Sequence, residues 1–412
     1  LMSLLFTAFY YPLIKWSVIL GTEVSILTFL IMWVTFLTIK SVKTKKFSPL
    51  LFVLLGIGVF IRMDLLLPAF IITVYLFLFN PKNKIKYLTI GIPIILLFTG
   101  ILEGLRFWYY HDLLPNTFYH KLTGYPFLPR VTRGIYVTAK AFLPNIISLN
   151  VFILAAPFVY GYFTRNKYLF LLLSLFSGQI IYNIYIGGDA WEHYGGANRF
   201  FAFVMPLFFI SFSVALNSLR QLIKAQIRNK KLQYAYVEFM FIFIIFLVLN
   251  RGSNNTWALR ELFLTTTPLT TTEAQTRVKE AIVLDRITNP NTKIAVSASG
   301  IVPYFVDAYF IDSLGKNDKV IAKEPMHYSK TYSSFMQKYT SFYPGHMKWD
   351  YTYIVKKYKP DIFVEFYQNY GEHNEIYLKT QGYVQMITPE GFGFYILKGS
   401  PNVITKDLKP QK

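Results

Sequence analysis

Long apolar runs constrain this chain more than any other feature of its sequence. Several runs approach twenty residues with almost no charge, among them VSILTFLIMWVTFLTI at 24–39 and FMFIFIIFLVL at 239–249. Of the 412 residues, 53% are hydrophobic and 18% are aromatic, which is too apolar for an ordinary soluble enzyme. An apolar run of about twenty residues can cross a bilayer as a helix. The sequence therefore predicts a polytopic α-helical membrane protein.

The acidic residues divide the chain into two parts. Residues 1–250 contain seven Asp and Glu against 22 Lys and Arg, whereas residues 251–412 contain fifteen against twenty. We therefore expect a transmembrane domain over 1–250 and a soluble domain over 251–412. In the second part, strand-like TKIAVSASG, AYFIDS and DIFVEFY alternate with helical stretches, and YVQMIT with FGFYILKG suggests a terminal hairpin. This alternation predicts a small α/β sheet.

The formal charge of +20 does not indicate a nucleic-acid partner. Most of the surplus lies in short loops between apolar runs, where the positive-inside bias of membrane proteins accounts for it. The chain has no cysteine, which excludes disulfides and thiol chemistry. It begins at Leu1 within an apolar run, so we expect a further segment to precede it.

Basic clusters set the expected orientation. The four clusters at 40–46, 82–86, 165–167 and 220–231 are assigned to the cytoplasmic side. This assignment predicts nine passes, near 1–14, 23–39, 48–61, 66–80, 87–105, 145–163, 168–186, 200–218 and 233–250, and leaves the C-terminal domain outside. Six of the seven acidic residues of the membrane part then face outward: Glu23, Asp64, Glu103, Asp112, Asp189 and Glu192. Charges are costly near a membrane and are commonly functional there, so we expect an outward-facing polar site.

The longest predicted outer loop, 106–134, mixes aromatic and basic residues. Its aromatic side chains, including Tyr109, suit the stacking of sugar rings, and Lys121, Arg130 and Arg133 suit a phosphate. Together they suit a lipid-phosphate head group that bears a sugar. An interfacial loop with an ordinary aromatic belt is an equally good interpretation of the composition.

A second polar segment, 186–200, reads IGGDAWEHYGGANRF. Glycines allow the backbone to approach a ligand closely. The carboxylates of Asp189 and Glu192 and the imidazole of His193 are metal ligands, partners of sugar hydroxyls or general bases. Arg199 opens the next apolar run and is placed to face a phosphate. The alternative is a solvated glycine-rich turn.

Six motifs occur in an order that resembles one enzyme family: YYPLIKWSVILGTEV (10–24), IRMDLLL (61–67), YYHDLLPNTFYHKLTG (109–124), GGDAWEHYGGANRFFAFVMP (187–206), IDSLGKND (311–318) and PGHMKWD (344–350). They look like landmarks of GT-C polyprenyl-phosphate-dependent membrane glycosyltransferases, similar to the mycobacterial terminal arabinofuranosyltransferase family. The similarity runs over nearly the whole chain.

The resemblance implies an enzyme of the bacterial inner membrane with an extracytoplasmic C-terminal α/β domain covering its site. It would move a sugar from a polyprenyl-phosphate carrier to a cell-envelope glycan or glycolipid, in contact with membrane lipid and with or without a divalent cation. No metal ligand and no other cofactor is assigned.

By motif position, the resemblance implies supporting catalytic roles for Asp189 and His193. Substrate-binding roles are expected for these residues: Glu23, Arg62, Asp64, Tyr109, Asn116, Thr117, Lys121, Arg130, Arg133, Glu192, Asn198, Arg199, His346 and Asp350. Two departures stand out. The turn reads RMD, where the family more often has a proline between Arg and Asp. Such enzymes also usually carry their catalytic acid in the first outer loop, so we expect the principal base upstream of Leu1.

Two other classes of function remain open. A transporter or flippase usually has internal repeats and charges at the bilayer midplane, and the sequence displays neither. A non-catalytic protein that binds lipid-linked glycans would use the same residue types without a base.

Overall fold

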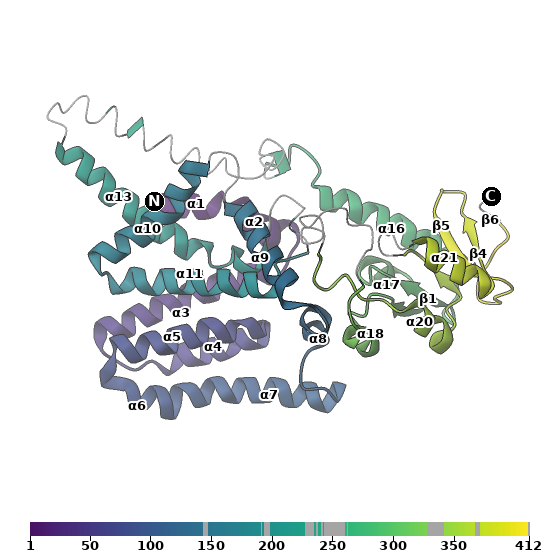
Figure 1. Cartoon of the computed structure of the whole chain (residues 1–412), viewed down its shortest axis with the longest axis horizontal. Helices are drawn as coiled ribbons and strands as arrows, with labels where there is room; N and C mark the ends of the chain where they lie inside the picture. The colour runs from purple at the N-terminus through teal and green to yellow at the C-terminus, as the bar shows by residue number, and fades with distance from the viewer. Residues whose placement is uncertain are drawn as a thin grey trace. The chain divides into compact units, whose positions relative to one another are not determined.

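Helices occupy most of residues 1–226 and a small mixed sheet follows them, as the computed structural model in Figure 1 shows. The structure describes residues 1–142, 147–190, 192, 198–226, 235, 238–239, 242, 260–261, 263–327, 342–366 and 371–410. The chain divides into two compact units. Unit 1 comprises Leu1–Leu113 and Val131–Thr266, and unit 2 comprises Leu114–Arg130 and Thr267–Lys412.

Unit 1 is helical. Its helices, one of which begins in unit 2, are α1 (Met2–Ala8), α2 (Tyr11–Ile14), α3 (Val24–Thr44), α4 (Pro49–Ile61), α5 (Leu66–Phe79), α6 (Lys84–Lys86), α7 (Ile92–Tyr110), α9 (Phe127–Phe142), α10 (Ile147–Thr164), α11 (Lys167–Ile186), α12 (Arg199–Ala202) and α13 (Met205–Gln226). Helix α4 lies against α3 and α7, and α11 lies against α5, α10 and α13. The boundary between the units falls within α9.

The core of unit 1 is aromatic and aliphatic. Phe176 of α11 stacks near Phe208 of α13, with ring centroids 4.8 Å apart, and Phe208 lies parallel to Phe212. Each of these rings is buried. Burial of one such ring contributes about 1.5–3 kcal/mol, so this seam alone fixes α11 against α13.

The number of predicted passes needs correction. Among the described residues, four helices are long and apolar enough to cross a membrane: Val24–Thr44, Pro81–Tyr110, Lys167–Ile186 and Met205–Ala225. A fifth arises if the bent pair Met2–Ala8 and Tyr11–Ile19 counts as one span. The nine passes are therefore not supported.

Helix length explains the difference. Helices α4 and α5 have 13 and 14 residues. At 1.5 Å per residue each is about 20 Å long, which is short of the roughly 30 Å hydrocarbon core. The predicted pass at 145–163 also begins in residues that the structure does not describe, and most of 233–250 lies outside the described residues.

Two chain breaks place polar residues at helix ends. Arg62 is extended, with φ −153° and ψ 127°, so α4 ends before the predicted IRMD turn and α5 follows it. Helix α11 is capped at its start by the Asn166 side chain, which accepts from Tyr168 N and Leu169 N. It ends at Gly187, whose φ of 86° suits a residue without a Cβ. The segment after Gly187 carries the candidate polar residues.

Unit 2 is built on a six-stranded sheet with the order β2-β1-β3-β5-β4-β6. Strands β1 (Lys293–Val296), β2 (Tyr309–Asp312) and β3 (Ile362–Phe363) are parallel. Strands β4 (Tyr383–Ile387) and β5 (Gly393–Leu397) form an antiparallel hairpin, which joins β3 through β5, and β6 (Lys409–Pro410) pairs with β4. The predicted strands and the terminal hairpin are thus confirmed.

The helices of unit 2 are α8 (Asn116–Leu122), α16 (Leu269–Ile287), α17 (Ile301–Phe305), α18 (Lys319–Lys323), α20 (Tyr351–Tyr358) and α21 (Gly371–Thr380). Helices α16 and α20 contribute to the cores on the two faces of the sheet. Along β1, Ile294 and Val296 join the core under α16, whereas Ala295 joins the core under α20. Successive side chains of a strand point to opposite faces, so β1 is buried on both sides, as is usual for parallel strands.

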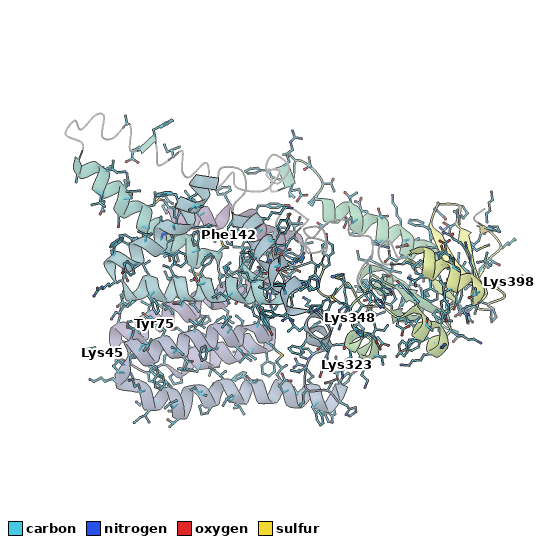
Figure 2. The ribbon with its side chains drawn as sticks, viewed as in Figure 1. Lys45, Tyr75, Phe142, Lys323, Lys348 and Lys398 are labelled. Atoms are coloured by element: carbon cyan, nitrogen blue, oxygen red, sulfur yellow. The ribbon has the colours of Figure 1, made fainter. Side chains whose placement is uncertain are left out.

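The segment Leu114–Arg130 belongs structurally to unit 2. Lys348, labelled in Figure 2, is fully buried, and its Nζ donates to Tyr119 O at 2.9 Å, Thr123 O at 2.6 Å and Ala322 O at 2.6 Å. Asn116 Nδ2 donates to the carbonyls of Gly315 and Lys316 at 2.9 and 2.8 Å. These bonds hold α8 on the loops that follow β2 and α18. The predicted division at residue 250 had placed this segment with the membrane part.

Candidate functional site

A buried group of charges lies where α4 ends and α3 begins. Arg62 Nε and Nη2 contact the two carboxylate oxygens of Asp64 at 2.9 and 2.5 Å, which is a bidentate pair. Arg62 Nη1 lies 3.4 Å from Glu23 Oε1. Gln179 of α11 donates to Asp64 Oδ2 at 3.3 Å. Three of the residues predicted from the sequence, Glu23, Arg62 and Asp64, therefore form one network.

A second group lies beyond the C-terminus of α11. Arg133 of α9 is almost completely buried, and its Nη2 contacts Glu192 Oε2 and the Asp189 carbonyl, each at 3.1 Å. Its Nη1 donates to the carbonyl of Gly187. Glu192 Oε1 accepts from Asp189 N at 2.8 Å and from Asn198 Nδ2 at 2.6 Å. Arg133 therefore holds Gly187, Asp189 and Glu192 together through these contacts.

Glycine is required in this turn. Gly188 has φ +80°, and a Cβ at that position would lie 2.5 Å from Val137, 2.6 Å from Glu192 Oε1 and 2.9 Å from Arg133 Nη1. Gly134 of α9 likewise lets the helix approach the α11 backbone, since a Cβ there would lie 2.2 Å from Ile184 O. Gly187 and Gly188 both have positive φ, as the alternative of a glycine-rich turn requires; Gly195 and Gly196 lie outside the described residues.

One aromatic ring joins the two groups. The guanidinium carbon of Arg62 lies 4.9 Å from the centroid of Phe200, and that of Arg199 lies 5.5 Å from it. Together the charged residues form a continuous row at one end of unit 1, which we call the charge belt: Glu23, Arg62, Asp64, Arg133, Asp189, Glu192 and Arg199. Four of the six acidic residues that the sequence placed on one side belong to the charge belt: Glu23, Asp64, Asp189 and Glu192.

Arg199 differs from the other arginines of the belt. Its Nε forms an ion pair with Asp189 Oδ2 at 2.9 Å, and its guanidinium lies 5.6 Å from the Trp16 ring centroid. No hydrogen bond joins its two Nη groups to the residues that the structure describes. Its side chain is 27% exposed, against 3% for Arg133 and 12% for Arg62. Arg199 therefore presents a guanidinium edge with the geometry that binds phosphate or carboxylate.

Asp189 and Glu192 are two carboxylates in different environments. Asp189 is 1% exposed; Arg199 Nε pairs with its Oδ2 at 2.9 Å, and no further hydrogen bond from the described residues reaches either carboxylate oxygen. Burial raises the pKa of Glu192 to about 7, against the lowering effect of Arg133 and of the hydrogen bonds from Asp189 N and Asn198. A carboxyl group that titrates near neutral pH can take up and release a proton during turnover.

The candidate residues of α8 and of 342–350 meet within unit 2. A Cβ on Gly345 would lie 3.2 Å from Lys121 Cγ and 3.9 Å from His120 Nδ1. Burial lowers the pKa of His120 to about 4 and that of His346 well below its ordinary value, with Lys316 contributing to both shifts. Both imidazoles are therefore neutral at pH 7. Lys121 and His346, predicted from separate motifs, lie in one basic cluster, and Thr117 is exposed on α8.

Other predicted residues have structural partners. Asp350 caps α20 by accepting from Tyr353 N at 2.8 Å, and Asn198 caps α12 by accepting from Phe200 N at 2.9 Å. Arg130 is buried and contacts the Leu122 carbonyl at 3.4 Å. Tyr109 is exposed near the end of α7. His193 lies outside the described residues.

Sequence reasoning missed several polar residues of unit 1. Gln179 and Asn183 are fully buried on α11, and Asn183 contacts both Thr138 and Asn198. Residues four positions apart lie on the same face of a helix, so this spacing within an apolar helix predicts a polar face that points into the protein. Lys15 is also 1% exposed, with Nζ 5.5 Å from the Tyr11 ring centroid. A lysine inside an apolar run carries the same signal.

The described residues contain no group of three or more His, Asp or Glu side chains that could hold a metal ion. The carboxylates of the charge belt are instead paired with arginines.

Comparison with known proteins covers only unit 2. Residues 265–397, from before α16 to the end of β5, match the model of a family described as a domain of unknown function, DUF8728. No curated protein and no solved structure matches the chain. The sheet of unit 2 is therefore similar to a family whose description names no activity.

Proposed function

We propose that this protein is a GT-C-like membrane glycosyltransferase that takes a sugar from a polyprenyl-phosphate carrier and transfers it to a cell-envelope glycan or glycolipid. The observation that carries the proposal is the charge belt at one end of unit 1, in which Arg199 keeps a guanidinium edge beside the buried Asp189 carboxylate. The reaction needs a cation that binds the departing phosphate and a carboxylate that binds the acceptor hydroxyl.

The leaving group requires a cation. Transfer from a lipid phosphate develops negative charge on the departing phosphate, and a fixed guanidinium in a partly buried site stabilises that charge more than water does. Trp16 and Phe200 flank Arg199, and Asp189 holds its Nε, so its edge is oriented before substrate binds. Such preorganisation is worth about 3–4 kcal/mol for one donor.

The acceptor hydroxyl requires a base. Asp189 has carboxylate oxygens with unused acceptor capacity, and Glu192 titrates near neutral pH. In our proposal Asp189 binds a sugar hydroxyl and Glu192 holds the turn that presents it.

Membrane placement fits the same proposal. Four helices have the length and composition to cross a bilayer, and a polyprenyl carrier is confined to one. We assign the charge belt to the outer face of the bacterial inner membrane, because the basic loops 40–46 and 82–86 lie at the opposite ends of helices α3 and α7.

The test is transfer by the full-length protein in nanodiscs, with polyprenyl-phosphate pentoses and hexoses as donors. We expect Arg199→Gln to lower kcat/KM by about a hundredfold or more, since it removes one charged donor to the phosphate. The matched control is Arg286→Gln, because Arg286 is an exposed arginine of unit 2 paired with Glu390. Donor movement across proteoliposomes without transfer would instead indicate a flippase, and donor binding without either would indicate a non-catalytic binder.

A further inference from the structure

A pocket of about 170 Å³ runs along the edge strand β2 of unit 2 and reaches the carboxyl end of that strand. Its walls come from the segment after β1, from β2 itself, from the 317–318 loop and from the end of α20. Ligands of α/β sheets commonly bind outside the carboxyl ends of parallel strands. The volume is below the roughly 300–1,000 Å³ of drug-sized sites, so the pocket suits one small ring.

One wall of the pocket is aromatic. Tyr309 at the start of β2 is 55% exposed, and Pro303 and Tyr358 also line the space. An exposed tyrosine ring on an edge strand has no packing role in the sheet core. Flat aromatic faces of this kind stack on the apolar faces of sugar rings.

Another part of the lining, at the carboxyl end of β2, is polar and fixed. Asp312 Oδ2 accepts from Asn317 N at 2.8 Å and from Ser299 Oγ at 3.3 Å, and its Oδ1 accepts from Leu314 N at 2.9 Å. A carboxylate has about four acceptor positions, so Asp312 keeps capacity for one further hydroxyl.

Asp318 is held in a similar way. Its Oδ2 accepts from Tyr353 Oη at 3.2 Å and from Tyr358 Oη at 3.0 Å, while its Oδ1 caps α18. Both carboxylates are therefore rigid before any ligand binds, which lowers the entropic cost of binding.

The charges of the lining exclude other ligand classes. Two carboxylates repel a phosphate or another anion. Among the described residues there is no third carboxylate or imidazole to complete a metal site here. What remains is a neutral ring whose hydroxyls donate to carboxylates and accept from the Asn317 amide.

We infer that this pocket is a binding subsite for one neutral sugar ring of a glycan. Its ring stacks on Tyr309, and its hydroxyls hydrogen bond to Asp312 and Asn317. That this sugar belongs to the acceptor of the transfer reaction rests on the proposed function; the sugar site itself does not.

The experiment is a donor-free titration of the full chain in nanodiscs with short neutral arabino-, galacto- and manno-oligosaccharides, followed by saturation-transfer NMR and calorimetry. We expect at least one to bind, and Tyr309→Ala to weaken its binding about tenfold, the value of one lost stacking contact. Asn317→Ala should also weaken binding. Both residues are exposed, so both variants should fold.

The matched control is Asn291→Ala, an exposed asparagine in the turn before β1 that does not line the pocket. Its affinity should equal that of the unaltered protein. The proposal is overturned if no neutral oligosaccharide binds, if Tyr309→Ala binds normally, or if inorganic phosphate competes for the site. If the protein binds a sugar but transfers none, the subsite is supported and the proposed function is refuted. If it transfers sugar but binds no neutral oligosaccharide without donor, the proposed function is supported and the subsite is refuted.

Discussion

Arg133 offers the sharpest test of how the charge belt is held together. Replacement by methionine keeps the apolar stem but removes three contacts: with the Gly187 carbonyl, with the Asp189 carbonyl at 3.1 Å and with Glu192 Oε2 at 3.1 Å. It also leaves the Glu192 carboxyl buried without its cation. Loss of one partner of a buried ion pair costs about 3–5 kcal/mol of unfolding free energy.

The cost should depend on Glu192. In the double variant Arg133→Met with Glu192→Gln, neither altered position carries a buried charge, and only the two carbonyl bonds and the altered amide contacts are lost. At about 1 kcal/mol for each hydrogen bond, we expect the double variant to be destabilised by roughly 2 kcal/mol, less than Arg133→Met alone. Arg133→Met should therefore cost about 1–3 kcal/mol more than the double variant, and this difference plus the cost of Glu192→Gln alone is the coupling energy between the two positions.

The assay is thermal unfolding of the detergent-solubilised protein above pH 7, where Glu192 is ionised. For a unit of this size 1 kcal/mol shifts Tm by roughly 2–4 °C, so Arg133→Met should lower Tm by roughly 10 °C. Partial recovery in the double variant supports the argument. If the two substitutions are additive, or if Arg133→Met shifts Tm by less than about 2 °C, Arg133 does not neutralise Glu192.

Four further outcomes follow from the same contacts. Burial raises the pKa of Glu192 to about 7, so the folded state binds this proton more tightly than the unfolded state does. As the pH rises from about 4.5 to 7, the unfolding free energy in denaturant titrations should therefore fall by roughly 3 kcal/mol. Glu192→Gln should remove most of this pH dependence. Gly188→Ala should cost about 1–2 kcal/mol for the left-handed backbone, with further loss from the crowding of Glu192, and a normal Tm would contradict that reading. Lys348→Met leaves three carbonyls without a donor and should cost about 3 kcal/mol, measured as increased proteolysis of 114–130. Asp350→Ala should lower unfolding free energy by about 1 kcal/mol through the lost α20 cap while leaving donor affinity unchanged, which separates a capping from a binding role.

Local pattern explains which parts of the fold were predictable. Strands β1 and β2 were identified because a short apolar run bounded by small residues has one good interpretation at that length. The predicted number of membrane passes was too high, because hydropathy detects apolar runs but does not show where a helix ends within a run. Arg62 illustrates this limit: its extended backbone ends α4 after 13 residues.

The members of the charge belt were predictable, but their pairings were not. Charge placement alone suggested that Glu23, Asp64 and Asp189 share one end of the helices. The partners of Arg62 include Glu23, 39 positions away, and Arg133 meets Asp189 across 56 positions. Such contacts follow from the packing of α3, α9 and α11, which no local pattern encodes. The buried carboxyl of Glu192 was therefore assigned to substrate, although its contacts position the turn.

The basic cluster of unit 2 depends on residues far along the chain. Lys348 Nζ reaches the Tyr119 carbonyl across 229 positions, and Asn116 bonds to loop carbonyls about 200 positions away. Lys121 lies between the Tyr119 and Thr123 carbonyls, which Lys348 binds, so its position depends on the domain that resembles the DUF8728 family. A substitution in that domain can therefore alter how Lys121 is presented without contacting any ligand of the loop. In the proposed transferase, the sheet of unit 2 would therefore position Lys121 as well as carry the proposed sugar subsite.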